Sequence, residues 1–206
     1  AAPARLKGTP NVCGIVGVVG FVGAWAIAAQ FVDGYSGVDD AISRLAAVDS
    51  PVRGWMTAGF VAFGVGVPLF AQALRTTLAG PAWIAATVTG IATLGVACTP
   101  LGRYDTAHFV FATIGYVSLA ATPLLASRTL RDRGEVGAAR WSVACGLATA
   151  LLLTASMIAV LILAAGSARP NLRESVTVLA ALLHWVIVFS MLPPVLAGRV
   201  VVYRLI

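Results

Sequence analysis

The sequence carries little charge for its length. Asp, Glu, Lys and Arg together make up 11% of its 206 residues, whereas soluble domains contain about 25%. Apolar residues make up 59%, and the mean hydropathy is +0.92. A soluble fold of this size would lack the polar side chains to cover its surface. The composition therefore excludes a soluble domain, a disordered chain, a secreted disulfide scaffold and a nucleic-acid-binding module, and it indicates an integral membrane protein.

Several motifs of nucleotide-binding and hydrolytic enzymes are also missing. The chain has no P-loop, no dinucleotide fingerprint, no G-x-S-x-G elbow and no C-x-x-C pair. Its three cysteines, Cys13, Cys98 and Cys145, are scattered through apolar segments without metal-binding or redox spacing. We interpret them as small apolar residues of the core.

What the sequence does contain is a series of long apolar runs. A bilayer core of roughly 30 Å requires about 20 apolar residues in a helix, and six segments meet that length. They are residues 12–32, 55–74, 82–98, 107–126, 142–165 and 175–197. The sequence therefore predicts one all-α domain, residues 1–206, in which six transmembrane helices form a polytopic bundle.

The basic residues orient this bundle. With the N-terminus inside, nine of the 14 basic residues fall on the inner side, whereas six of the eight acidic residues fall on the outer side. Basic residues are enriched in cytoplasmic loops. We therefore expect a multi-pass protein of the cell membrane with both termini in the cytoplasm, and its Ala-, Val- and Gly-rich composition is typical of a GC-rich bacterial genome.

Small residues recur every three or four positions in three of the spans. Gly14, Gly17, Gly20 and Gly23 lie in the first span, Ala62 and other small residues continue the pattern in the second, and Gly146 begins a similar series in the fifth. Small residues allow helices to approach closely in lipid. We expect these faces to pack within the chain, and a homodimer through the first span is the alternative.

The first outer loop, residues 33–54, contains an apolar pattern of its own. Ile42, Leu45 and Val48 recur at helical spacing, with charged residues elsewhere around the turn. We expect a short amphipathic helix over residues 39–48, lying on the outer surface. Pro51 and Gly54 would end it before the second span.

The same loop carries a family resemblance. The stretch Tyr35-Ser36, then Ile42-Ser43-Arg44-Leu45-Ala46-Ala47, then Ser50-Pro51 ahead of a Gly-rich span, resembles the DUF998 family of uncharacterised bacterial multi-span membrane proteins. Asp105-Thr106-Ala107-His108 is a second point of similarity. The resemblance implies a helical membrane bundle, with Ser43, Arg44, Leu45 and Pro51 as an outer-loop motif. It implies no catalytic residue.

Ionisable residues within a membrane are costly and are therefore candidates for function. Asp105 and His108 share a face near the outer end of the fourth span, and Glu174 and His184 share a face of the sixth. Ser43 lies on the same outer side. One hypothesis is an outward-facing cavity in which Asp105, His108 and His184 hold zinc and Glu174 or Ser43 assists hydrolysis of a lipid. The alternative is that the two histidines only brace the helices through hydrogen bonds.

For function we favour a non-catalytic accessory subunit or lipid-binding bundle of a larger membrane assembly. Its partners would be membrane lipids, with other membrane subunits or a second copy as further candidates, and no nucleic acid. A metal-dependent hydrolase and a carrier for a small hydrophobic molecule are the alternatives. A carrier requires a cavity that continues past Thr122 toward the inner face.

Native mass spectrometry after mild extraction separates these hypotheses. If Asp105, His108 and His184 hold zinc, the protein carries a zinc-sized mass that His108→Ala removes, because the substitution deletes a ligand. A copurifying lipid or protein without such a mass is the outcome expected for the lipid-binding or accessory function.

Overall fold

The computed structural model describes residues 9–37, 40–77 and 80–164, and every regular element in them is helical. The long helices are α1 (Thr9–Ala28), α2 (Arg53–Thr77), α3 (Ala82–Cys98), α4 (Asp105–Asp132) and α5 (Val136–Ala164). Two 3₁₀ helices lie between α1 and α2. The first, η1 (Ala29–Phe31), directly follows α1, and the second, η2 (Ile42–Ala46), lies in the loop before α2.

The described part of the chain is all-helical, as expected for a helical membrane protein. Four of its long helices, α1 with η1, α2, α4 and α5, are long and apolar enough to cross a membrane. The remaining helix, α3, has 17 residues. At 1.5 Å per residue it extends about 26 Å, which meets the lower limit for a span. The predicted sixth span, residues 175–197, lies outside the described residues, so the six-span count and the orientation stay predictions.

The helices at residues 105–132 and 136–164 extend beyond the predicted spans. The predicted inner segment between them, residues 127–141, is therefore mostly helical, and the connection contains only residues 133–135. Gly134 adopts a left-handed conformation with φ 77°, and its N–H donates to the Arg131 carbonyl at 2.9 Å. A glycine at this position ends a helix without steric strain, so α5 can return directly alongside α4.

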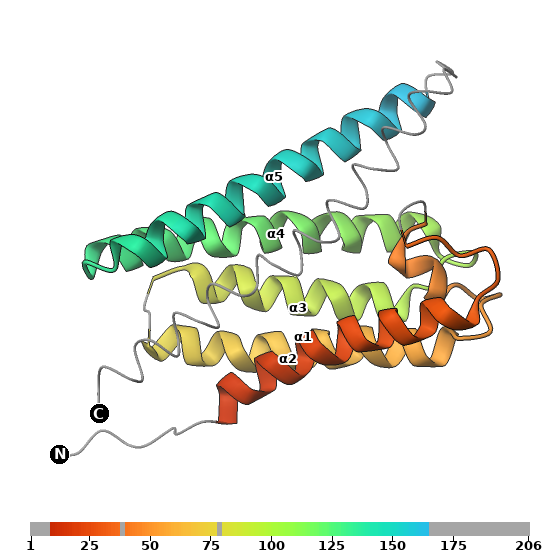
Figure 1. The fold of residues 1–206 in the computed structure, drawn as a ribbon, viewed down its shortest axis with the longest axis horizontal. Helices are drawn as coiled ribbons and strands as arrows, with labels where there is room; N and C mark the ends of the chain where they lie inside the picture. Colours follow the sequence, from red (N-terminus) through yellow and green to blue (C-terminus); the bar gives the residue numbers. More distant parts are fainter. Residues whose placement is uncertain (1–8, 38–39, 78–79, 165–206) are drawn as a thin grey trace.

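The helices pack in sequence order. Each of α1 to α4 contacts the next helix along the chain. Figure 1 shows α2, α3 and α4 side by side, while α5 inclines away from α4 toward its C-terminal end. On α5, Ser142 donates to the Pro123 carbonyl of α4 at 2.8 Å. On α3, Thr89 donates to Ser118 of α4 at 2.9 Å. These buried hydrogen bonds fix α3 and α5 against α4.

The small residues of α1 pack against α2, as predicted. A methyl group placed on Gly17 would lie 2.9 Å from the Ala62 carbonyl oxygen, and one placed on Gly66 would lie 2.5 Å from the Cys13 carbonyl oxygen. Both distances are shorter than real contacts of this kind, so only glycine permits this approach. On α5, a methyl group on Gly146 would collide with Leu124 of α4, which extends the same principle to that pair.

The predicted amphipathic helix over residues 39–48 is wrong in length and type. The structure has a five-residue 3₁₀ helix, flanked by extended Ala41 and Ala47. Residues three apart eclipse each other in a 3₁₀ helix, so Ile42 and Leu45 share one face and are buried. Val48 lies beyond the helix and is 40% exposed. The buried face contacts α1 and α2, so this helix packs on protein.

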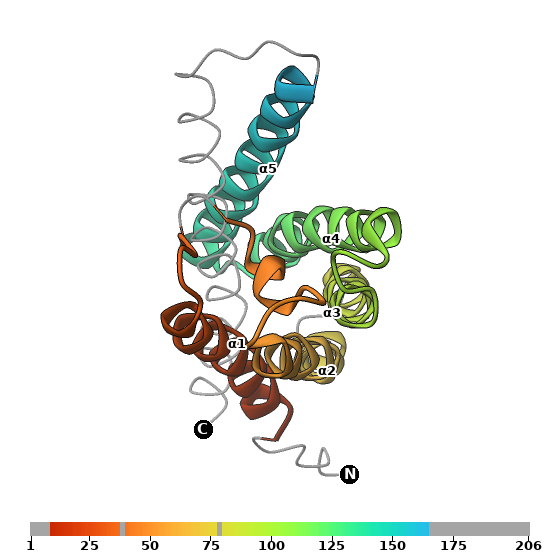
Figure 2. The same ribbon diagram turned by 90° about the vertical axis from the view of Figure 1, so that its right-hand side faces the viewer.

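We call residues 32–37 and 40–52 the cap, and the end of the bundle beneath them the cap end. Figure 2 looks onto that end and shows the η2 segment, in orange, between α1, α2, α3 and α4. The cap is also tied to the α3–α4 connection, where the Val48 N–H donates to the Leu101 carbonyl at 3.1 Å. The cap therefore covers the ends of four helices.

Two clusters of buried apolar side chains form the core. The cluster at the cap end contains Ala28, Ile42, Leu45, Ala46, Val52, Met56, Phe60 and Val96. The cluster toward the opposite end contains Phe63, Val67, Phe70, Ala71, Leu74, Ala82, Ala86, Leu119, Ala126, Leu130 and Ala139. Together they fill the space between α2, α3 and α4 above and below the middle of the bundle.

The α1–α2 contact predicts a contrast between two glycines. Gly66→Ala forces a methyl group onto backbone of α1 that cannot move aside, and we expect a loss of about 1–3 kcal/mol in the free energy of unfolding. Gly23→Ala is the matched control, because nothing lies within 4 Å of its added methyl. Unfolding monitored by circular dichroism in one detergent compares the two variants, and equal stabilities would contradict the packing.

Candidate functional site: a capped cavity

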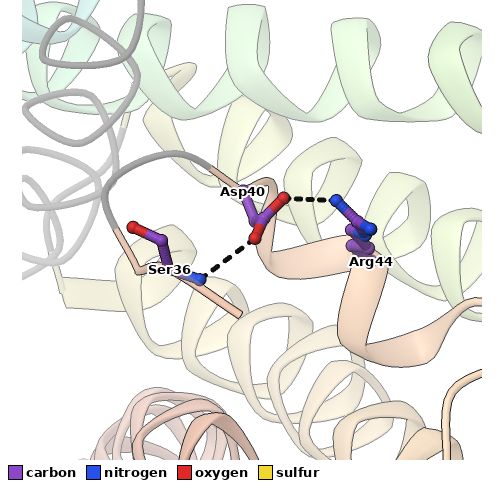
Figure 3. Close-up of polar contacts among 3 residues, drawn as sticks. All are labelled: Ser36, Asp40 and Arg44. Atoms are coloured by element: carbon purple, nitrogen blue, oxygen red, sulfur yellow. Dashed lines mark hydrogen bonds and ion pairs between the residues drawn. The ribbon is translucent and has the colours of Figure 1, made fainter. Parts of the chain in front are cut away.

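The cap is held by one carboxylate. Asp40 accepts a hydrogen bond from the Ser36 N–H at 3.0 Å through one oxygen and from Arg44 Nη1 at 2.5 Å through the other, and Figure 3 shows it between these two residues. The Asp40 side chain is 14% exposed, whereas that of Arg44 is 69% exposed. Asp40 therefore fixes the turn that precedes η2. Arg44 is the solvent-exposed partner of this ion pair.

A second hydrogen bond attaches the cap to α1. Trp25 Nε1 donates to the Tyr35 hydroxyl at 3.0 Å, and both side chains pack against the core cluster at the cap end. Burial raises the pKa of the Tyr35 phenol above its ordinary value, the Trp25 hydrogen bond lowers it, and the nearby Asp40 charge raises it further. Tyr35 is therefore neutral at physiological pH.

Beneath the cap lies a cavity of about 90 Å³, where the two core clusters meet. Its walls come from α1, η2, α2, α3 and α4. The lining residues are Phe21, Ile42, Ser43, Phe60, Phe63, Thr89, Thr93, Val96, His108, Phe111, Ala112, Gly115, Tyr116 and Leu119. The α4 members lie three, four, seven, eight and eleven residues after His108, so a single face of α4 forms one wall.

His108 is the buried ionisable residue of this cavity and is 3% exposed. Its Nδ1 lies 2.6 Å from the Thr99 carbonyl oxygen at the C-terminal end of α3. Because a carbonyl oxygen only accepts, Nδ1 carries the hydrogen, and Nε2 of the neutral ring is an acceptor. The same bond satisfies a carbonyl that the end of α3 leaves without a helical partner.

Asp105 does not enter the cavity. Its side chain is exposed, and Oδ1 accepts a hydrogen bond from the Gly102 N–H at 2.7 Å. Gly102 adopts φ 84°, so the carboxylate stabilises the tight turn that begins α4. The predicted pair thus divides: Asp105 holds a turn, while His108 lines the cavity.

The predicted metal site stays a prediction. Within residues 9–37, 40–77 and 80–164, no group of three or more His, Cys, Asp or Glu side chains is placed to hold a metal ion. Two members of the predicted set, His184 and Glu174, lie outside the described residues. The structure therefore tests neither the zinc ligands nor the bracing role of His184.

The four residues of the predicted outer-loop motif lie in four different surroundings. Ser43 lines the cavity beside His108, Leu45 is 1% exposed in the core, and Arg44 pairs with Asp40 at the surface. Pro51 lines a separate polar hollow of about 140 Å³ on the cap, together with Asp33, Asp40, Arg44, Asp49 and Ser50, among others. Ser43 therefore is the motif residue that reaches the cavity.

Sequence analysis did not find the deeper cavity residues. Thr89 and Thr93 on α3 and Tyr116 on α4 line the cavity but were not among the candidates. The signal available was the spacing of Phe111, Gly115 and Tyr116 after His108, which places them on the His108 face of one helix. That pattern is common in buried helices, so it indicates a cavity only once the neighbouring helices are placed.

Comparison with models of protein families assigns most of the chain to one family. The family model described as "Protein of unknown function (DUF998)" matches residues 15–200, which is most of the chain. The chain belongs to the DUF998 family. The predicted resemblance is confirmed, and the DUF998 match includes the cap and all the residues that line the cavity. No curated protein and no solved structure matches the chain.

The hydrogen bonds of the cap in this DUF998 protein predict that substitutions of Asp40 and Arg44 change the stability of the cap to different extents. Asp40→Ala removes the acceptor of the half-buried Ser36 N–H, so amide hydrogen exchange over residues 42–47 should accelerate about tenfold, as expected for a lost charge-assisted hydrogen bond of roughly 1.5 kcal/mol. Arg44→Ala removes only an exposed ion-pair partner and should change exchange less than threefold. Hydrogen-exchange mass spectrometry measures both, and equal acceleration would show that the ion pair holds the cap.

Proposed function

We propose that this DUF998 protein is a lipid-binding bundle that takes up the end of an apolar chain in the cavity beneath its cap. The observation that carries the proposal is the position of the cavity, which is lined mostly by aromatic and aliphatic side chains between two filled core clusters. Ligand pockets are typically concave, mostly apolar and furnished with a few polar groups. This cavity has each of these properties.

The size of the cavity supports a chain end as its occupant. An engineered apolar cavity of about 150 Å³ stays dry and takes up benzene. At about 90 Å³, this cavity suits a smaller group, such as the last carbons of an acyl or isoprenoid chain. Burial of that group gains about 0.8 kcal/mol per CH₂ only if it comes from water, so in a membrane the gain comes from shape and from contacts with the walls.

The filled half of the bundle supports binding over transport. The deepest cavity residue on α4 is Leu119, and Thr122, one turn further, is 1% exposed and donates to the Ser118 carbonyl at 2.9 Å. Beyond it the second core cluster occupies the space between the helices. A carrier would need a path through this region. Within the described residues the cavity is a pocket with a floor.

The separation of Asp105 from His108 supports binding over hydrolysis. The exposed carboxylate of Asp105 is engaged with Gly102, and His108 Nδ1 is engaged with Thr99. A zinc hydrolase built on the predicted ligands would need the exposed Asp105 carboxylate at the cavity, and Asp105 does not line it. The binding proposal uses the site as it stands.

The proposal also includes a location and partners. In the cell membrane with the N-terminus inside, the cap lies on the outer side, so lipids of the outer leaflet are the nearest source of an occupant. The α1 face with Val12, Val16 and Val19 is more than half exposed and meets lipid, another subunit or a second copy. These contacts would make the protein an accessory, lipid-binding member of an assembly.

Filling the cavity tests the function. Ala112 lines the cavity, so Ala112→Leu places a larger side chain where the chain end would lie. Val110→Leu is the matched control on the same helix, since Val110 is 52% exposed outside the cavity. We expect native mass spectrometry from lipid nanodiscs to detect a retained lipid on the wild type and on Val110→Leu, and at least tenfold less on Ala112→Leu.

The thermal unfolding midpoints of both variants serve as the check on folding. A lipid retained equally by Ala112→Leu, at an unchanged midpoint, would show that the lipid binds elsewhere on the bundle. No retained lipid on the wild type, with an intact fold, would contradict the proposed function itself.

A further inference from the structure

Three polar side chains that line the cavity have hydrogen-bonding capacity left over. In the part of the chain that the structure describes, Ser43 Oγ, Tyr116 Oη and His108 Nε2 have no hydrogen-bond partner. The His108 side chain is more than nine-tenths buried, and those of Ser43 and Tyr116 are half-buried, so few partners besides a ligand can reach them. Such capacity directed at a cavity indicates an occupant with polar atoms of its own.

The other polar side chains of the cavity are already satisfied. Thr89 donates to the Ala85 carbonyl or to Ser118 Oγ, and Thr93 donates to the Thr89 carbonyl at 2.8 Å. These bonds remain within and between α3 and α4. They offer little to a ligand, so polar recognition falls to Ser43, His108 and Tyr116.

We propose that the chain end in the cavity carries a hydroxyl group, as in a long-chain alcohol, and that this hydroxyl donates to His108 Nε2. This inference rests on the proposed function and specifies the ligand of the same site. Nε2 requires a donor, because the Thr99 bond leaves it as an acceptor. Ser43 donates to the oxygen of the same hydroxyl from the cap.

The placement of the polar groups orients the ligand. His108 and Ser43 lie at the cap end of the cavity, and Tyr116 lies eight residues further along α4, which is about 12 Å. The hydroxyl therefore sits under the cap. The hydroxyl-bearing end of the chain, with its first few carbons, therefore fills the cavity between the cap and Leu119.

The charge of the cavity excludes ionised head groups from it. Among the described lining residues there is no Asp, Glu, Lys or Arg, so beside the neutral His108 ring a carboxylate or phosphate inside would have no opposite charge. An unpaired buried ion costs far more than a buried hydroxyl that finds a partner. A phospholipid head or a fatty carboxylate therefore does not fit at His108, whereas an alcohol does.

Two probes of equal length separate head-group recognition from chain binding. The full chain in nanodiscs, with ¹⁵N-labelled histidine, is titrated with 1-dodecanol and, separately, with dodecane. The chain has two histidines, so the spectrum of a His108→Asn variant assigns the His108 resonances. We expect 1-dodecanol to shift the His108 Nε2 resonance in a saturable way and dodecane to leave it unchanged.

His108→Asn is also the matched variant for affinity. The Asn amide N–H₂ can replace Nδ1 as donor to the Thr99 carbonyl, while the Nε2 acceptor is lost. We expect this variant to bind 1-dodecanol at least tenfold more weakly than the wild type and to bind dodecane equally. Its unfolding midpoint reports whether the Thr99 bond is preserved, and Tyr116→Phe provides a second variant that keeps the shape of the cavity.

The outcomes distinguish this inference from the proposed function. Equal binding of both probes, with no His108 shift, would overturn the hydroxyl assignment and leave chain binding intact. Binding of neither probe to the wild type would overturn both. Binding of 1-dodecanol that survives His108→Asn and weakens in Tyr116→Phe would overturn the placement of the hydroxyl under the cap.

Discussion

Insertion of Ile42 and Leu45 between the helices at the cap end is the contact on which the cavity depends. Leu45 is 1% exposed, and deleting a side chain so buried typically costs 2–5 kcal/mol. Both side chains lie on one face of a single 3₁₀ turn. The Asp40 carboxylate and the Val48–Leu101 hydrogen bond hold this turn in place. Without that turn the space between the two core clusters would be open at its end, and Ser43 would not face His108.

The bundle supplies the walls through close helix contacts in lipid. Glycines at Gly17 and Gly66 let α1 lie against α2 at backbone distance, and the Thr89–Ser118 bond fixes α3 to α4. Between these contacts, the aromatic rings of Phe21, Phe60 and Phe63 lie along one side of the cavity. The Phe21 ring is tilted against the other two, with centroid distances of 5.3 Å to Phe60 and 5.5 Å to Phe63. Tight packing elsewhere is therefore what leaves a defined space here.

The buried histidine joins structure and binding. One ring nitrogen satisfies the end of α3, and this bond sets the tautomer that makes the other nitrogen an acceptor. A residue that was a candidate because it is costly in a membrane thus has a structural reason to be there as well. The described lining residues include no Asp, Glu, Lys or Arg, which under the proposed function favours an uncharged group as the occupant.

The sequence by itself determined the membrane character, five helices that the structure confirms, the small-residue faces and the family. Each follows from local composition or spacing, since a run of apolar residues has few alternatives to a helix in lipid. Tertiary structure alone decided that the loop forms a 3₁₀ turn packed on protein, that Asp105 remains outside, and that Ser43, His108 and Tyr116 share one cavity. These outcomes depend on contacts between residues as far apart as Ser43 and Tyr116, and no local pattern encodes the space that such contacts leave.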